Sequence, residues 1–229
     1  MVSTAVRLLR VCLLSMAILA GCAQSPPLSP APPTAATAST PAGGVDPSRI
    51  KRVRDELPPG YEVGDAPNVV SPADYWGFRS GWTAQPAPCA ALLHPVEGGS
   101  AQGLSASGDG GLLYVTVASR IPAGAVMLDP VLIADCGQWT MAYGGSSATI
   151  DLIEAPDIDD VDTVGMSSKI RTVVESGTET DSQAQTFTAY LGDYFVFVTL
   201  IVDPGSAHSP LPASDAADLL VKTVTALRG

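Results

Sequence analysis

The sequence predicts an α+β domain with a mainly antiparallel sheet flanked by helices, closed by one disulfide and preceded by a signal peptide and a disordered tether. Three observations carry this prediction. Strand-like segments come in pairs joined by glycine turns, helix-start signals occur before and after these pairs, and an apolar leader ends in a cysteine. The expected boundaries are 1–21 for the signal peptide, 22–46 for a lipidated cysteine and tether, and 47–229 for a single domain.

The composition limits the classes to which the protein can belong. The chain has 229 residues, of which 46% are hydrophobic, and a formal net charge of −11. This length is sufficient to bury a hydrophobic core. Nucleic-acid binding needs a basic face that displaces counterions, so the acidity argues against a nucleic-acid partner.

The N-terminal segment has the parts of an export signal. Arg7 and Arg10 precede an uncharged apolar run from Val11 to Ala20. As a helix, ten residues rise about 15 Å, which is half of a hydrocarbon core of roughly 30 Å. The run therefore favours a secretory signal over a membrane-spanning anchor.

The run ends in Leu19-Ala20-Gly21-Cys22, which resembles a bacterial lipobox. The resemblance implies cleavage before Cys22 and attachment of a diacylglyceryl group to its thiol. The alternative is cleavage of an ordinary signal peptide, with a cysteine at this position by coincidence. Two or three acyl chains hold a protein stably on a bilayer. We therefore expect a cell-membrane lipoprotein on the extracytoplasmic face, with the lipid bilayer as its partner through Cys22. Loss of residues 1–21 removes two arginines and changes the charge from −11 to −13.

The tether is predicted from composition. Residues 23–46 are mostly Pro, Ala, Ser and Thr and include no aromatic residue, so they bury too little apolar surface to repay their ordering entropy. A proline-rich chain of this kind is a semi-extended spacer.

Helix signals recur along the domain. Asp46-Pro47 is a cap followed by a favourable first residue, and Ile50, Val53 and Leu57 share one helical face. Ser71-Pro72-Ala73-Asp74 repeats the start signal and leads into Tyr75-Trp76-Gly77-Phe78. These aromatic residues belong either to the core or to the rim of a binding site, and the core is the favoured interpretation. Further helices are expected at 88–93, 162–176 and 214–228.

Strand patterns occupy the middle of the domain. Segments 112–118, 138–143, 148–154, 186–190 and 194–202 are rich in β-forming residues. Glycine turns join 138–143 to 148–154 and 186–190 to 194–202 as hairpins. Segment 194–202 is apolar at both odd and even positions, which predicts a central strand covered on both faces.

The four cysteines have separate expected roles. Cys12 lies in the signal peptide and Cys22 is the lipidation site, which leaves Cys89 and Cys136 in the exported domain. An even pair outside the cytosol most simply forms a disulfide. A metal site is the rival interpretation, but only His94 and His208 accompany the two cysteines, so no metal and no cofactor are expected.

Six acidic residues between Asp151 and Asp162 invite comparison with a calcium loop. In the register that starts at Asp160, Val164 and Arg171 occupy positions where an EF-hand needs oxygen ligands. A solvated loop with Asp162 capping a helix is therefore favoured over a looser divalent-cation site.

The sequence contains no recognised catalytic motif, which favours a protein that is not an enzyme. Residues 103–107 lack the second glycine of a nucleophile elbow and are expected to form a flexible loop. No phosphate loop or dinucleotide motif occurs. The alternative is a cell-envelope hydrolase that uses a serine with His94 or His208. The basic cluster at 49–54 is interpreted as a solvated helix face rather than a headgroup contact.

The lipobox, the tether and the two-cysteine domain together resemble secreted lipoproteins of mycobacteria and related actinobacteria. Within that set the chain resembles an uncharacterised family, a domain of unknown function that is distantly similar to extracellular sensor domains of PknH-type kinases. The residues that carry the resemblance are Pro88-Cys89-Ala90, Asp135-Cys136-Gly137-Gln138-Trp139 and Gly192-Asp193. It implies ligand or partner sensing in the envelope and assigns no binding residue.

These observations predict a membrane-tethered, non-catalytic module that binds a small envelope ligand or a protein partner. An apolar groove is its expected binding site. The residues expected to line that groove are Tyr75, Trp76, Phe78 and Trp82.

Overall fold

The computed structural model describes residues 44–96 and 98–229, so the signal peptide, Cys22 and most of the predicted tether lie outside the described residues. In chain order the elements are η1 (Pro47–Glu56), β1 (Glu62–Asp65), α1 (Pro72–Tyr75), β2 (Thr83–Gln85), η2 (Ala87–Leu92), β3 (Ser100–Gly108), β4 (Gly111–Ser119), α2 (Pro130–Asp135), β5 (Gln138–Tyr143), β6 (Ser146–Ile153), β7 (Asp162–Val173), β8 (Glu179–Leu191), β9 (Tyr194–Val202) and α3 (Ala213–Arg228).

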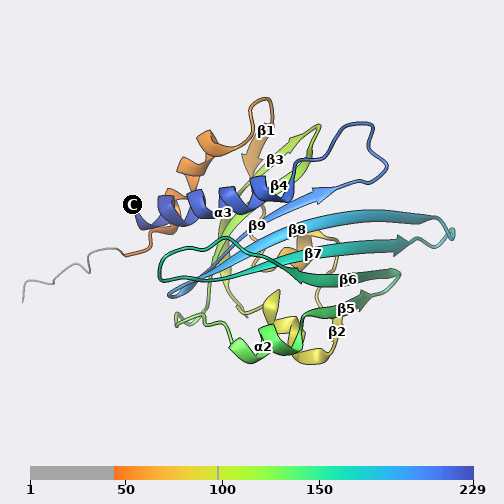
Figure 1. Ribbon diagram of the computed structural model, residues 1–229, viewed down its shortest axis with the longest axis horizontal. Helices are drawn as coiled ribbons and strands as arrows, with labels where there is room; N and C mark the ends of the chain where they lie inside the picture. The colour runs from red at the N-terminus through yellow and green to blue at the C-terminus, as the bar shows by residue number, and fades with distance from the viewer. Residues whose placement is uncertain (1–43, 97) are drawn as a thin grey trace, which may run out of the picture. The chain divides into compact units, whose positions relative to one another are not determined.

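The nine strands form one sheet in the order β1-β3-β4-β9-β8-β7-β6-β5-β2 (Figure 1). Every neighbouring pair is antiparallel. The predicted α+β class and the two predicted hairpins, β5–β6 and β8–β9, are confirmed. The edge strands are short, since β1 has four residues and β2 has three.

Strand β9 is covered on both faces, as its sequence predicts. Phe195 and Phe197 belong to the hydrophobic cluster on one face, while Val196 and Val198 belong to the cluster on the other. All four side chains are fully buried. The sheet therefore separates two hydrophobic cores.

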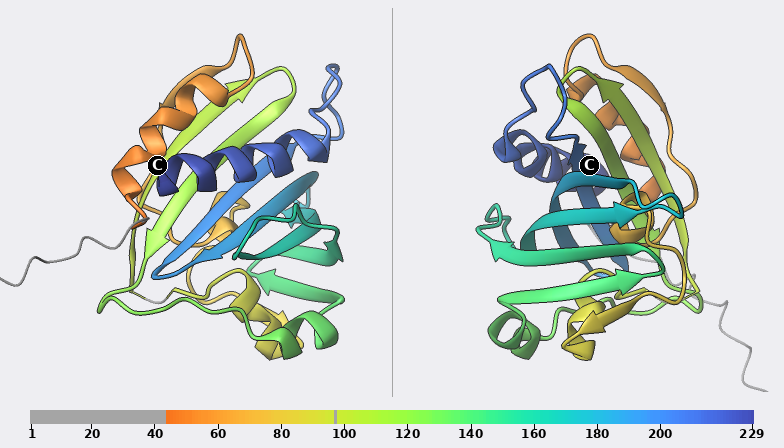
Figure 2. Two further views of the ribbon diagram at one scale, coloured as in Figure 1. Left: turned by 60° about the vertical axis from the view of Figure 1, so that its left-hand side comes forward. Right: turned by 90° about the vertical axis from the view of Figure 1, so that its right-hand side faces the viewer.

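Helix α3 and η1 cover one face, which we call the outer face (Figure 2). Leu220 and Val224 of α3 pack in this core with Ile50 of η1. The Asp46 side chain caps η1 by accepting from the Ser48 N–H at 3.0 Å, and the Asp46 N–H donates to the Leu227 carbonyl at 3.0 Å. The predicted first and last helices are confirmed, although η1 has the tighter 3₁₀ hydrogen-bonding pattern.

Helices α1 and η2 cover the inner face. Trp76, Phe78 and Leu92 pack there against Phe195 and Phe197. The predicted disulfide is confirmed: Cys89 in η2 is joined to Cys136, the residue after α2, with an S–S distance of 2.03 Å. It fastens two helices that lie on either side of the β3–β4 hairpin in sequence.

The predicted helix over 162–176 is wrong. This segment forms β7, which pairs with β6 and β8 along its length. Asp162 consequently begins a strand and caps no helix. Val164, Met166 and Ile170 face the protein interior, whereas Lys169 and Arg171 are exposed.

The flexible loop predicted at 103–107 is also wrong, because these residues lie in β3 and pair with β4. Leu104 and Ala106 are buried, and the serines alternate with them. Strands β1 and β2 and helix α2 have no counterpart in the sequence prediction. None of the helices within 44–96 and 98–229 combines the length and apolar character needed to cross a bilayer.

The disulfide makes a testable contribution to stability. Its loop, with a sequence separation of 47 residues, restricts the unfolded chain. The chain-entropy model gives a ceiling of about 4 kcal/mol for such a loop. We expect the Cys89→Ala, Cys136→Ala double variant to unfold at lower urea concentration than the oxidised protein.

Reductant should lower the unfolding midpoint of the wild type and leave that of the double variant unchanged. Iodoacetamide should label neither cysteine in the folded, oxidised protein. Labelling without reductant would contradict the bridge.

Candidate binding site on the outer face of the sheet

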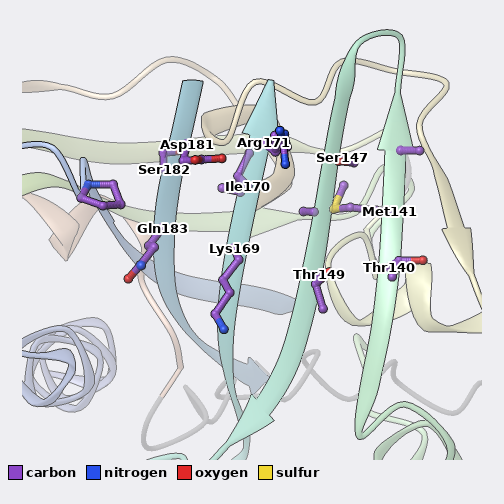
Figure 3. Close-up of a pocket in the computed structure, with 13 residues that line it drawn as sticks. Thr140, Met141, Ser147, Thr149, Lys169, Ile170, Arg171, Asp181, Ser182 and Gln183 are labelled. Carbon is purple, nitrogen blue, oxygen red and sulfur yellow. The ribbon is translucent and has the colours of Figure 1, made fainter. Parts of the chain in front are cut away.

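The outer face is only partly covered. Helix α3 packs on β4, β8 and β9, while outward side chains of β5, β6 and β7 are open to solvent. A hollow of about 680 Å³ lies over β5 to β8 (Figure 3). We call it the outer hollow. Its polar lining residues are Thr140, Ser147, Thr149, Lys169, Arg171, Asp181, Ser182 and Gln183.

The strand register arranges these residues in rows. Thr140, Thr149, Lys169 and Gln183 are direct cross-strand neighbours on β5, β6, β7 and β8. Neighbouring strands lie about 4.8 Å apart, so this row presents two hydroxyls, an ammonium group and an amide at regular intervals. Two residues further along each strand, Arg171 and Asp181 lie in a second row on the same face.

The two cations of the hollow differ in their pairing. The guanidinium of Arg171 forms an ion pair with Glu179. Lys169 is exposed and makes no ion pair with any residue that the structure describes. The hollow therefore offers an ammonium group and the Asp181 carboxylate, neither in an ion pair with a described residue, among uncharged hydrogen-bonding groups.

Polar contacts continue along the same face beyond the hollow. The Gln185 amide donates to the Ser167 hydroxyl at 3.1 Å, and the Gln138 amide donates to the Asp151 carboxylate at 2.5 Å. These groups satisfy each other, whereas Lys169 and the hydroxyls of Thr140 and Thr149 have no hydrogen-bond partner among the described side chains. The arrangement suits hydrogen bonding to a polar ligand.

The aromatic residues predicted to line an apolar groove lie mainly in the inner core. Phe78 is 0% exposed and Trp76 is 6% exposed. The Trp76 indole N–H donates to the buried Thr199 hydroxyl at 3.1 Å, and Thr199 also contacts the Thr186 hydroxyl at 2.6 Å. These two aromatic side chains are core residues and face no open groove.

Tyr75 and Trp82 are half-buried. The Tyr75 ring stacks on Tyr114 with centroids 3.9 Å apart, and burial raises the pKa of Tyr75 to about 12. Trp82 lies near Trp139 and borders a separate hollow of about 520 Å³ together with His94. Of the predicted groove residues, Trp82 thus lines this second hollow.

Neither histidine side chain is hydrogen-bonded to a serine hydroxyl in the described ranges. His208 lies 3.9 Å from the Asp109 carboxylate on an exposed surface. His94 is near Asp74, whose pKa is raised by burial and partly lowered again by His94.

The acidic segment 151–162 connects two strands. Asp151 lies in β6, and the carbonyls of Asp159 and Asp160 accept from the Arg228 guanidinium at 2.9 and 3.5 Å. Across the described part of the chain, no group of three or more His, Cys, Asp or Glu residues is placed to hold a metal ion.

Sequence reasoning missed the outer hollow because it placed Lys169 and Arg171 on a helix. A signal was present: Val164, Met166, Ser168 and Ile170 alternate with more polar residues, which is the period of a half-buried strand. The hollow joins residues of four strands, and that arrangement has no local sequence signal.

The fold is therefore a disulfide-bridged α+β domain. Helices cover one half of the outer face of its sheet, and the other half is open. The chain belongs to the family described as a domain of unknown function, DUF5642, whose model matches residues 46–228. No curated protein matches the chain in sequence.

Two solved structures are similar to this chain to different degrees. The X-ray structure of an uncharacterised protein from Mycobacterium smegmatis, the Rv0999 ortholog, is 23% identical, with a TM-score of 0.61 over 81% of this chain and 98% of that chain. The extracellular domain of PknH from Mycobacterium tuberculosis is 11% identical, with a TM-score of 0.39 over 80% of this chain and 92% of that chain. The expected resemblance to an uncharacterised family, with a distant likeness to PknH, is confirmed.

The disulfide also bears on location. Structural disulfides persist in oxidising compartments and are rare in the cytosol. The Cys89–Cys136 bridge therefore indicates an extracytoplasmic location for the described domain.

Trp76 and Thr199 supply a test of the closed inner core. Thr199→Val keeps the side-chain shape but leaves the Trp76 indole N–H without its partner. An unpaired buried donor costs about 1–3 kcal/mol. We therefore expect the free energy of unfolding, measured by urea denaturation, to fall by at least that amount, because the buried Thr186 hydroxyl loses its partner as well.

Ser168→Ala is the matched control. The Ser168 hydroxyl is buried without a partner, so its removal should be neutral or stabilising by up to about 1 kcal/mol. A Thr199→Val variant as stable as the wild type would mean that the indole is not held in a closed core.

Proposed function

We propose that this protein is a lipid-anchored, non-catalytic binding module of the cell envelope. It holds a small polar ligand, or a polar segment of a partner, in the outer hollow. The observation that carries the proposal is the outer hollow itself, where hydroxyl, amide and ammonium groups stand in cross-strand rows on an uncovered part of the sheet.

The chemistry of the hollow favours binding over catalysis. Its rows supply hydrogen-bond donors and acceptors, and Lys169 supplies a positive charge with no ion pair among the described residues. Nucleophilic catalysis by serine needs a base within hydrogen-bond reach. Ser147 and Ser182 line the hollow together with Lys169 but with no histidine, and no hydrogen bond joins either serine hydroxyl to Lys169 in the described ranges.

The membrane anchor in this proposal is supported by the sequence of the first 22 residues. A short apolar run behind two arginines ends in Leu19-Ala20-Gly21-Cys22, the order in which an export signal precedes a lipidated cysteine. The Cys89–Cys136 disulfide agrees with an exported domain.

Filling the outer hollow with a bulky side chain should abolish ligand binding. Thr149 lies in the middle of the first row, between Thr140 and Lys169, so Thr149→Trp would fill the hollow from its floor. We expect native mass spectrometry of the protein isolated from its own envelope to show a discrete bound mass in the wild type and a loss of that mass in Thr149→Trp.

Thr225→Trp, on the exposed side of α3, is the matched control and should retain the bound mass. The same bound mass in both variants would refute the outer hollow as the ligand site.

The anchor has its own test. Cys22→Ala removes the thiol that the lipid would occupy. We expect unprocessed precursor to accumulate and any mature chain to leave the membrane fraction, because two or three acyl chains supply the stable attachment. Normal cleavage together with unchanged membrane fractionation of Cys22→Ala would disprove lipidation at this residue.

A further inference from the structure

Large apolar side chains are exposed in the connection between β4 and β5. Met127 is 80% exposed and Ile121 is 64% exposed, the two highest values among the exposed large hydrophobic residues that the structure describes. Both lie in the loop 120–129, which is held in place where the Val126 N–H donates to the Gly192 carbonyl at 2.8 Å. We call Ile121 and Met127 the exposed apolar pair.

This loop lies at the end of the sheet where the described chain begins. Asp46 is bonded to Leu227, and Arg228 is bonded to the carbonyls of Asp159 and Asp160, just before β7 begins. The first residue of β7, Asp162, pairs with Tyr190, next to the turn at Gly192. In Figure 1 the C-terminal end of α3, the β8–β9 turn and the loop after β4 lie on the same side.

The opposite end of the sheet is far away. Strand β7 has 12 residues, which at about 3.3 Å per residue span roughly 40 Å. Val174 follows β7 at that opposite end and is 48% exposed. The molecule therefore carries exposed apolar residues at two ends, and only one of them adjoins the start of the described chain.

The charges around the exposed apolar pair are mixed. Arg120 precedes Ile121 and donates to the Ala125 carbonyl, and the exposed Lys51 of η1 borders a hollow with Ala101 at the start of β3. Asp159, Asp160 and Asp193 are exposed at the same end. This balance gives no strong attraction to anionic surfaces, so apolar contact is the main force available there.

We propose that this end of the domain docks on the lipid surface through Ile121 and Met127. The proposal rests on the lipid anchor proposed above. An anchor at Cys22 precedes Gly44 by 21 intervening residues and enters the domain at this end, which holds the exposed apolar pair at high local concentration near the bilayer. A second copy is a poorer occupant, because each mature chain carries a charge of −13 once Arg7 and Arg10 are removed from the −11 of the full chain.

Docking fixes the orientation of the domain on the bilayer, which attachment through Cys22 alone does not. With the loop 120–129 on the bilayer, the tip of the β7–β8 hairpin points away from it, since the two lie at opposite ends of β7. The outer hollow, over β5 to β8, then faces the aqueous side of the envelope.

The test uses the full lipidated chain in vesicles with a nitroxide label on one added cysteine. The two cysteines of the domain are bridged, so an added thiol is labelled alone. Met127→Cys reports the docking loop, and Val174→Cys is the matched control at the opposite end. Power-saturation electron paramagnetic resonance measures how accessible the nitroxide is to two reagents. Dissolved oxygen concentrates in lipid, whereas a nickel complex stays in water.

On phosphatidylcholine vesicles, we expect label 127 to lose contact with nickel severalfold and to gain contact with oxygen, whereas label 174 stays in contact with nickel. Equal accessibility of the two labels in vesicle-bound protein would overturn docking while leaving the anchor intact. A chain that does not sediment with vesicles would overturn both proposals. Protection that requires phosphatidylglycerol would assign the contact to charge and overturn the role of the apolar pair.

A label at a second position tests docking without replacing Met127. Gly124 lies between the two apolar residues, and a side chain there would meet no atom within 4 Å, so Gly124→Cys carries a label without a clash. Label 124 should be shielded from nickel in the otherwise unchanged chain and exposed in the Ile121→Gln, Met127→Gln background. Vesicle sedimentation should be the same in both, because the lipid is unchanged. Shielding that survives both substitutions would refute the exposed apolar pair as the docking residues.

Discussion

Strand β9 is the constraint on which the architecture depends. Residues 195–200 are fully buried on both faces of the sheet, so this strand needs a neighbour on each side and a layer over each face. Strands β4 and β8 flank it, α3 and η1 cover the outer face, and α1 and η2 cover the inner face. Thr199, the polar residue in this stretch, is satisfied by Thr186 and Trp76, which ties the inner layer to the strand. Because α3 runs over β9 and its neighbours, the far half of the same face is left open.

The sequence anticipated the parts of the fold that leave a strong local pattern. The hairpins at 138–154 and 186–202 have glycine turns between β-rich segments, and the helix at 214–228 has an apolar stripe with clear ends. Segment 162–176 was misassigned because residues four apart, such as Met166 and Ile170, share a face in both a helix and a strand. Pairing with β6 and β8 then decides the conformation. Strand β3 escaped notice because four of the five residues from Gly103 to Ser107 are small. The segment forms a strand through pairing with β4 and, from Leu104 onward, with β1.

The candidate site was less predictable than the fold. The Cys89–Cys136 bridge follows from counting cysteines, but the aromatic cluster at 75–82 was open to two interpretations, and burial of Trp76 and Phe78 is a property of the assembled inner core. The outer hollow joins residues from four strands separated by up to 43 positions, Thr140 to Gln183, so no window of sequence contains it. Its rows exist only because the strands pair in one register.

The short edge strands affect how readily the sheet pairs with strands of other chains. Each edge of the sheet has unpaired backbone groups, and a long flat edge recruits strands from other molecules. Here β1 exposes only four residues, including the charged Glu62 and Asp65, and β2 exposes three. Long hydrophobic strands such as β9 are sequestered in the middle. Two short edge strands, one of them carrying two carboxylates, therefore give another chain few backbone groups with which to pair.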